Sequence, residues 1–395
     1  HGCCGRRSGS GARQMARLVP FSPVIKWDRR MNGEGREAMP SLGILSCYSV
    51  RRGNPLSQAD LFRQYCEVGR RVGLDVFVFS PRDIDWHRRR IAGYVWEGGR
   101  WRQTPVPFPD LVMDRCRCLG TEEMRRTRVA LRTLRRHGVR LLGVALPGKW
   151  PVYRRLVGTP AVRWLPETVL YTGWASVESL LARHGCVVIK PSVGTAGAGL
   201  LLIDRDGGRL RIRGRTMRNG VFYRLFSRAR DAAVFLDRWT EGRRFVVQQG
   251  IDLLMEGGRV ADVRAFVQKN ASGAWELVAA GGRVGPRGSA TSNLHGGGRG
   301  VPLAVLLEPL DAPVRARVRA ELRELALTVA RTVEAAFGPL FELGLDVGID
   351  RAGRLWLLEV NSKPGRALFA RIGDRAGARA VVENPIRYAA RLCRQ

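Results

Sequence analysis

The sequence predicts a protein of mixed α/β and α+β class, in which a parallel α/β domain precedes two α+β units. Three observations carry this prediction. Strands alternate with helices from Ser41 onward, a glycine-rich loop separates two apolar strands at residues 186–203, and an acidic hairpin lies near the C-terminus. The expected boundaries are 1–38 for an N-terminal extension, 39–148 for the α/β domain, 149–245 for the second unit and 246–395 for the third.

The first domain is predicted from a repeated order of short apolar runs and amphipathic helices. Such an order is typical of a parallel sheet with crossover helices. The domain lacks a glycine fingerprint for a dinucleotide. Strands are expected at residues 42–48, 74–80, 109–115 and 139–146, helices at 58–73 and 122–138, and a hairpin-like insertion near 94–101.

A long helix is predicted in the third unit at residues 313–337. Gly338 follows it as a stop signal. Apolar side chains recur there at spacings of three and four, which places them on one face of a helix. These side chains are Val314, Val318, Leu322, Leu325, Val329 and Val333.

The net charge of +32 is the most unusual total, and such a charge normally indicates nucleic acid, an acidic polymer or an anionic surface as partner. Only five of the 67 basic residues are lysines. This arginine bias is also what GC-rich coding produces without selection for binding, so nucleic acid is a secondary expectation. No apolar run approaches the roughly 20 residues of a membrane span.

Residues 1–38 are rich in Gly, Arg and Ser and show no period, so we expect a disordered or spurious extension with Met39 as initiator. The eight cysteines lack the paired C-x-x-C spacing of a zinc site, since Cys116 and Cys118 form only C-x-C. No signal-peptide pattern is present. Reduced thiols in a cytoplasmic protein are therefore expected.

The stretch CVVIKPSVGTAGAGLLLI, residues 186–203, contains Gly194, Gly197 and Gly199 between two apolar strands. Glycine lets backbone N–H groups approach phosphate oxygens closely, although a plain hairpin loop is the alternative. Lys190 ends the first strand, where an ammonium inside an apolar run needs an anionic partner. The loop leads into a strand rather than a helix, so it fits neither a P-loop nor a Rossmann turn. A flexible hairpin closing over a triphosphate remains.

The stretch FELGLDVGIDRAGRLWLLEVN predicts two strands around a turn. If Asp350 pairs with Leu355, Asp346 falls opposite Glu359, and Asn361 shares the face of Glu359. Facing carboxylates in an apolar hairpin need a positive charge between them, and Mg²⁺ takes such oxygen ligands. The alternative is an exposed sheet face on which the asparagine starts a turn.

Three further segments lie between the glycine loop and the hairpin. FVVQQGIDLL is an apolar strand that suits adenine binding or a plain core. In DVRAFVQKN, Asp262 and Arg264 share a face, so that an acid can orient an arginine toward phosphate, or the two form a surface ion pair. The polar loop at residues 283–298 contains Arg283, Asn293 and three consecutive glycines, a composition typical of binding loops and of mobile loops.

The order of these motifs resembles the ATP-grasp superfamily and, within it, the YheC/YheD family, described as endospore coat-associated proteins. The resemblance covers residues 41 to about 390, and the hairpin motif is the most specific part of it. The segment from Asp262 to Gly298 is similar to the RimK-type and glutathione-synthetase-like branches. The motifs that carry it are GKWPVYRRL, VVIKPSVGTAGAG, VVQQGIDLL, DVRAFVQKN, SNLHGGG and ELGLDVGID with LWLLEVNSKPG.

The resemblance implies an ATP-grasp fold in which two α+β units clamp ATP, and it implies a role for each matching residue. Many ATP-grasp enzymes have a glutamate where this chain has a glutamine on the adenine strand. Nucleotide contacts are implied for Lys149, Lys190, Gly194, Thr195, Gly197, Gly199, Gln248, Gln249 and Ile251. Magnesium contacts are implied for Asp346, Glu359 and Asn361, and contacts with phosphate and carboxylate for Arg264, Arg283 and Asn293.

The activity that follows is an ATP-dependent carboxylate–amine ligase working through an acyl phosphate, with two Mg²⁺ ions or Mn²⁺ in their place. Small-molecule or peptide acids and amines are the expected substrates, and their identity and the oligomeric state stay open. A cytoplasmic location with spore association is expected. The alternatives are a spore-coat-associated protein that binds ATP without catalysis, and a ligase that modifies a polyanion-bound target.

Overall fold

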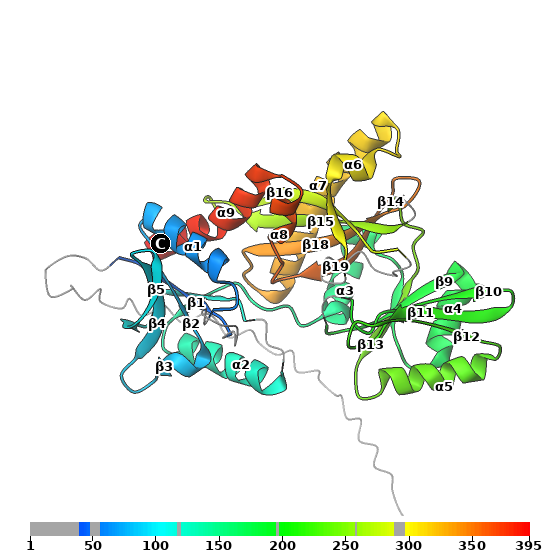
Figure 1. Ribbon diagram of the computed structural model, residues 1–395, viewed down its shortest axis with the longest axis horizontal. Coiled ribbons are helices and arrows are strands. Elements are labelled where there is room, and N and C mark those ends of the chain that lie inside the picture. Colours follow the sequence, from blue (N-terminus) through cyan, green and yellow to red (C-terminus); the bar gives the residue numbers. More distant parts are fainter. Residues whose placement is uncertain (1–38, 48–55, 117–119, 195–196, 257–258, 288–296) are drawn as a thin grey trace, which may run out of the picture. The chain divides into compact units, whose positions relative to one another are not determined.

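The computed structural model describes residues 39–47, 56–116, 120–194, 197–256, 259–287 and 297–395 (Figure 1). The predicted extension 1–38 lies outside them. The described residues form one sheet with a parallel centre and two antiparallel sheets, which confirms the mixed α/β and α+β class. Among these residues, no helix combines the length and the apolar character needed to cross a bilayer.

The first sheet has the parallel centre that the alternation of strands and helices predicts. Its parallel strands lie in the order β2-β1-β6-β7, and β4 runs antiparallel to β2 and pairs with β5 in the expected hairpin. The strands are β1 Ser41–Leu45, β2 Asp75–Phe79, β3 Ile84–Asp85, β4 Arg90–Glu97, β5 Arg100–Pro107, β6 Leu111–Asp114 and β7 Arg140–Leu142. The helices are α1 Ala59–Arg71, the short 3₁₀ turn η1 Pro81–Asp83, and α2 Thr121–Arg136.

The second sheet contains the two strands that flank the glycine loop, and its order is β12-β11-β10-β9-β13-β8. Helices α4 and α5 pack on this sheet through a shared apolar core. The strands are β8 Thr168–Leu170, β9 Cys186–Pro191, β10 Leu201–Asp206, β11 Arg209–Arg215, β12 Val221–Phe226 and β13 Phe245–Gln249. The helices are α3 Lys149–Val157, the 3₁₀ turn η2 Pro160–Trp164, α4 Trp174–His184 and α5 Ala229–Thr240.

The third sheet carries the acidic hairpin, and its order is β17-β16-β15-β18-β19, with β14 paired to β15. The predicted helix at 313–337 is confirmed as α7, which ends at Gly338 with a φ of 102°. The strands are β14 Met255–Glu256, β15 Arg259–Lys269, β16 Trp275–Val284, β17 Arg299–Pro302, β18 Glu342–Ile349 and β19 Leu355–Asn361. The helices are α6 Leu303–Leu307, α7 Ala312–Phe337, α8 Ala367–Arg371 and α9 Arg375–Arg394.

Two features of the packing were not predicted from the sequence. Helix α9 follows the hairpin, contains Pro385, and packs against α1, β15 and β16. Helix α3 and η2 contribute Val152, Leu156 and Trp164 to the same apolar core as β15, β18 and α7. These side chains therefore pack with the third unit, although the predicted boundary at residue 149 assigns them to the second. The domain boundaries themselves stay predictions.

Candidate active site

The acidic hairpin has the predicted pair of facing carboxylates. Asp346 on β18 lies opposite Glu359 on β19, and Asn361 lies opposite Gly344 two positions along. Because side chains alternate along a strand, the carboxylates and the amide share one face of the hairpin. Asp346 is 6% exposed, while Glu359 and Asn361 are partly buried. The predicted convergence of three oxygen-bearing residues on one face is confirmed.

The register near the turn differs from the prediction. Ile349, not Asp350, pairs with Leu355, so the two strands start one residue out of the expected alignment. A register shift then leaves Leu358 as an extra residue on β19, which is a β-bulge, and the bulge brings the later pairs back into the predicted alignment. The carbonyl of Leu358 accepts a hydrogen bond of 3.0 Å from Nζ of Lys190.

Lys190 is a buried ammonium on β9 that reaches the hairpin. Its Nζ also donates to Oε1 of Gln248 at 2.7 Å. Burial lowers the pKa of Lys190 to about 8, and the negative charges of Glu359 and Asp346 only partly offset this effect. Both of these hydrogen-bond acceptors are neutral, whereas the oxygens of a triphosphate are charged.

Lys149, the first residue of α3, connects the helix to the glycine loop and to the hairpin. Its Nζ donates to the carbonyl of Gly194 at 3.1 Å and lies 3.4 Å from Oε1 of Glu359. Its backbone N–H donates to the carbonyl of Ser192 at 2.8 Å. Gly148 makes this approach feasible, because it has a φ of 120° and a Cβ there would lie 2.8 Å from the same carbonyl oxygen.

A pocket open to solvent lies between these groups. Both lysines, Gln248 and Glu359 line its polar part. Apolar side chains form the remaining wall of the pocket, and such a wall suits the flat face of a purine. The wall was not predicted from the sequence, although the spacing of apolar side chains in KWPVYRRLV could have indicated an apolar face on α3. The wall is formed by Val152, Leu156, Leu165, Val246, Leu357 and Val360.

The three residues expected on the adenine strand lie in different surroundings. Gln248 lines the pocket, where its Nε2 donates to Oγ1 of Thr168 at 2.9 Å and its Oε1 accepts from the buried lysine. Gln249 points the other way, because strand side chains alternate, and its Oε1 accepts from the backbone N–H of Glu167 at 3.3 Å. Gln249 and Ile251 are not among the residues that line the pocket.

The glycine loop joins antiparallel β9 and β10, so the predicted hairpin is confirmed. Gly197 and Gly199 have φ values of 73° and 75°, in the left-handed region that favours glycine. Gly194 accepts the hydrogen bond from the α3 lysine. Thr195 and Asn293 lie outside the described residues.

Two arginines hold the carboxylate of Asp346. Nε of Arg264 donates to its Oδ1 at 2.7 Å, and Nη2 of Arg283 lies 3.0 Å from its Oδ2. Burial alone would raise the pKa of Asp346, but the charges of both arginines outweigh this effect and hold the pKa below its usual range. Asp262 shares a face with Arg264 as expected, but it binds Arg283 instead, through two bonds of 2.7 and 2.5 Å.

The donor set of the hairpin fits Mg²⁺ by its chemistry. Carboxylate and amide oxygens are the ligands this ion takes, and each carboxylate oxygen has a second lone pair besides the one that an arginine uses. In the part of the chain that the structure describes, no group of three or more His, Cys, Asp or Glu side chains could hold a metal. Asp346 and Glu359 therefore need Asn361 or a phosphate oxygen to complete a site.

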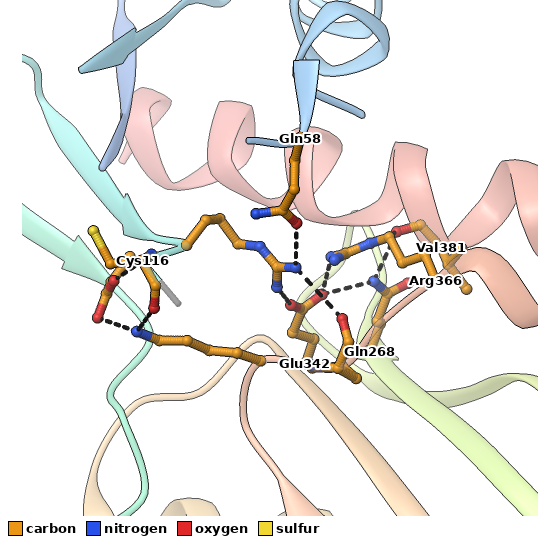
Figure 2. Close-up of polar contacts among 10 residues, drawn as sticks. Gln58, Cys116, Gln268, Glu342, Arg366 and Val381 are labelled. Carbon is orange, nitrogen blue, oxygen red and sulfur yellow. Dashed lines mark hydrogen bonds and ion pairs between the residues drawn. The ribbon is translucent and has the colours of Figure 1, made fainter. Parts of the chain in front are cut away.

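A buried charge cluster surrounds Glu342, at the start of β18 (Figure 2). Oε1 of Glu342, the first residue of the strand, lies 2.8 Å from Nη1 of Arg115, and its Oε2 contacts Arg366 and accepts from Nε2 of Gln268 at 3.2 Å. The side chains of Glu342 and Arg115 are at most 1% exposed. The charge within FELGLDV could have indicated this cluster, because a glutamate in an apolar strand needs a cation.

The loop after Asn361 is held by the last residue of β6 and the two residues that follow it. Nζ of Lys363 donates to Oδ2 of Asp114 at 2.5 Å and to the carbonyl of Cys116 at 3.0 Å. Arg115 donates to the carbonyl of Pro364 at 3.4 Å. The first sheet therefore fixes the loop that continues from the proposed metal ligands.

Comparisons with known proteins identify one family and solved structures of similar fold. The family model described as YheC/D like ATP-grasp matches residues 138–392. Endospore coat-associated protein YheD of Bacillus subtilis (strain 168) is 28% identical over 342 residues, which cover 84% of this chain and 74% of YheD. YheC of the same strain is 23% identical over 319 residues, which cover 80% of this chain and 87% of YheC. The crystal structure of D-cycloserine synthetase DcsG has a similar fold, with a TM-score of 0.54 and 15% identity, covering 89% of this chain and 99% of DcsG.

Proposed function

Because this chain belongs to the YheC/D-like ATP-grasp family, we propose that it is an ATP-dependent carboxylate–amine ligase that forms ADP. The observation that carries the proposal is the pocket in which two lysines from separate elements approach the acidic hairpin. Such a pocket offers an apolar wall for a base, cations for phosphates and carboxylates for a divalent ion.

In this proposal the nucleotide base lies against the apolar wall beside Gln248, while Lys149 and Lys190 bind phosphate oxygens. Among the described residues, the two hydrogen-bond acceptors of Lys190 are neutral, the side chain of Gln248 and the carbonyl of Leu358, so an anionic phosphate would be a stronger partner. Gln249 and Ile251 then support the strand rather than contact the base. The glycine loop at 194–199 would cover the phosphates, because its glycines permit close backbone approach.

Mg²⁺ would be held by Asp346, Glu359 and Asn361, and when bound it would neutralise charge on the phosphates. Two ions, with Mn²⁺ as a substitute, are part of the proposal. Arg264 holds Asp346 in place and lies on the metal face, where it can also bind a phosphate or carboxylate. Arg283 is 4% exposed and bound by two aspartates, so its role narrows to orienting Asp346.

The reaction then proceeds in two balanced steps. A carboxylate oxygen of the acid attacks the γ-phosphorus of ATP, and the bond from this phosphorus to the β-phosphate oxygen breaks. ADP is the leaving group, and an acyl phosphate is formed. The amine attacks the acyl carbon, phosphate leaves, and the amine loses a proton as the amide forms. The protein contributes mainly by positioning the reactants and stabilising charge.

The test is ADP release from pairs of acids and amines, with Glu359→Ala as the critical variant. Removing the Glu359 carboxylate should abolish ADP release. The far-UV circular dichroism should stay unchanged, because Glu359 is partly exposed and outside the apolar core. Glu308→Ala, at an exposed glutamate that follows α6, is the matched control and should retain turnover. Undiminished turnover in Glu359→Ala would refute the metal assignment.

The names of both Bacillus relatives support a second part of the proposal, that this chain associates with spores. A fluorescent fusion in sporulating cells of the source organism should then concentrate at the forespore. Signal that stays uniform through sporulation contradicts this part and leaves the ligase proposal intact. Nucleotide binding without ADP release for any substrate pair would favour a non-catalytic role.

A further inference from the structure

One edge of the second sheet exposes an apolar stripe. Strand β12 lies at the end of the strand order and, in the described part of the chain, pairs with β11 alone. Val221, Tyr223 and Leu225 alternate along it and are 64%, 55% and 36% exposed. Phe222 and Phe226, on the other face of the strand, pack instead against the core formed with α5. An open edge next to exposed apolar side chains is a site where another extended chain can pair.

The stripe lies on the same face of the sheet as the proposed nucleotide pocket. Strand pairing places Tyr223, Arg213, Leu202, Val188 and Gln248 in one row across β12, β11, β10, β9 and β13. Residues directly opposite one another share a face, and four strand spacings of about 4.8 Å separate the ends of this row by roughly 19 Å. A chain bound at β12 therefore lies on the pocket side of the sheet.

The surroundings of the stripe are strongly basic. Residues 201–230 contain nine arginines and two aspartates, an excess of seven positive charges. Asp204 and Asp206 form their ion pairs with Arg211 and Arg213 on β11. The excess charge at this edge favours a polyanionic partner, and the open strand edge favours one that is extended.

We propose that the open edge of β12 binds an extended acidic peptide by strand addition. Its apolar side chains would cover Val221, Tyr223 and Leu225, and its carboxylates would face the neighbouring arginines. This inference deepens the ligase proposal and rests on it in one respect, since it makes the bound peptide the source of the carboxylate to be activated. The substrate class is then an acidic peptide or protein segment rather than a free small acid.

Two other occupants fit the observations less well. Single-stranded nucleic acid needs a platform of aromatic side chains, but two of the three stripe residues are aliphatic, and Phe222 and Phe226 are turned toward α5. A second copy of the chain would bring together two molecules of net charge +32, which repel each other.

The experiment measures binding of a fluorescein-labelled peptide in which glutamate and valine alternate, by fluorescence anisotropy without nucleotide. A peptide of alternating lysine and valine is the charge control. Tyr223→Asp should weaken binding of the acidic peptide about tenfold or more, because it removes the central apolar contact and adds repulsion. Val221→Thr, a milder change of similar shape, should weaken it in the same direction. Val234→Asp on α5, at a residue 52% exposed, is the matched control and should bind as the unmodified protein does.

The outcomes separate this inference from its rivals. Equal binding by Tyr223→Asp and Val234→Asp, or equal binding of acidic and basic peptides, overturns it. It is also overturned if labelled oligouridylate binds more tightly than the peptide and loses affinity in Tyr223→Asp. Sedimentation that shows self-association abolished by the same variant would assign the edge to a second copy instead. Because no nucleotide is added, Glu359→Ala should keep peptide binding, so failure of the ligase proposal would not imitate failure of this one.

Discussion

Raising the pH from 7 to 9 should weaken nucleotide binding through Lys190. Burial lowers the pKa of this lysine from 10.5 to about 8, with Glu359 and Asp346 raising it only in part. With that pKa, roughly nine molecules in ten hold the ammonium at pH 7 and about one in ten at pH 9. If phosphate oxygens bind only the ammonium form, the affinity for ATP falls about tenfold across this interval.

Isothermal titration calorimetry in buffers of different ionisation enthalpy gives both the affinity and the proton uptake. Uptake of close to one proton per nucleotide is expected near pH 9, because the triphosphate restores the charge on Lys190. Lys190→Met should bind weakly at both pH values and take up no proton. Lys149→Met should also bind weakly but keep the pH dependence. An affinity that is flat from pH 7 to 9, or uptake that persists in Lys190→Met, would refute the reasoning.

The same pKa predicts the sign of a stability effect in the protein without nucleotide. Below pH 8 Lys190 carries its proton in both the folded and the unfolded chain, and burying the charge costs about 3 kcal/mol. The cost fades as the pH rises from about 8 to 10.5, where the folded state has already lost the proton. The contribution of this lysine to the free energy of unfolding therefore increases across that window, and the Lys190→Met variant should lack the increase.

Two further predictions concern the charges around the hairpin. Glu342→Gln leaves the buried Arg115 facing an amide, so urea unfolding should show a free energy of unfolding lower by about 3–5 kcal/mol. Glu67→Gln breaks the exposed pair with Arg63 and should lower it by about 0.5 kcal/mol or less. Equal losses in the two variants would contradict the assigned burial. Because the pocket is net positive, Mg²⁺ should bind only together with ATP, and titrating Mg²⁺ alone into the unmodified protein should give no heat above that of dilution. Saturable binding of the ion without nucleotide would contradict that charge balance.

The pairing of Asp346 with Glu359 could be predicted because it depends on local quantities, the length of the turn and the alternation of side chains along a strand. The prediction reached the right pair from a register that is wrong at the turn. The bulge at Leu358 compensated for the one-residue error in register. LWLLEVN contains no glycine or proline that would indicate a bulge. Alternation alone therefore could not show that the bulged carbonyl accepts a hydrogen bond from a lysine of another sheet.

The ion pairs of the site could not be derived in the same way, because their partners come from distant strands. Asp262 and Arg264 are neighbours on β15, yet each binds the residue opposite it on a different adjacent strand, Arg283 on β16 and Asp346 on β18. Sequence spacing shows which side chains share a face but not which strand lies next to them. The spacing in KWPVYRRLV could indicate an apolar face on α3, but not that this face lines the pocket, since that depends on packing against strands of other units.

Facing carboxylates need a positive charge between them, and the protein itself supplies much of that charge. Asp346 is already bound by two guanidiniums, and Glu359 lies near an ammonium. With Lys190 protonated, four cations oppose three carboxylates, and the site keeps one net positive charge. A magnesium ion arriving alone would meet repulsion, whereas a magnesium–nucleotide complex is an anion and would be attracted. The acidic hairpin is therefore better suited to binding the metal as part of the magnesium–nucleotide complex than to binding the free ion. The groups in this balance are Arg264, Arg283, Lys149 and Lys190 against Asp262, Asp346 and Glu359.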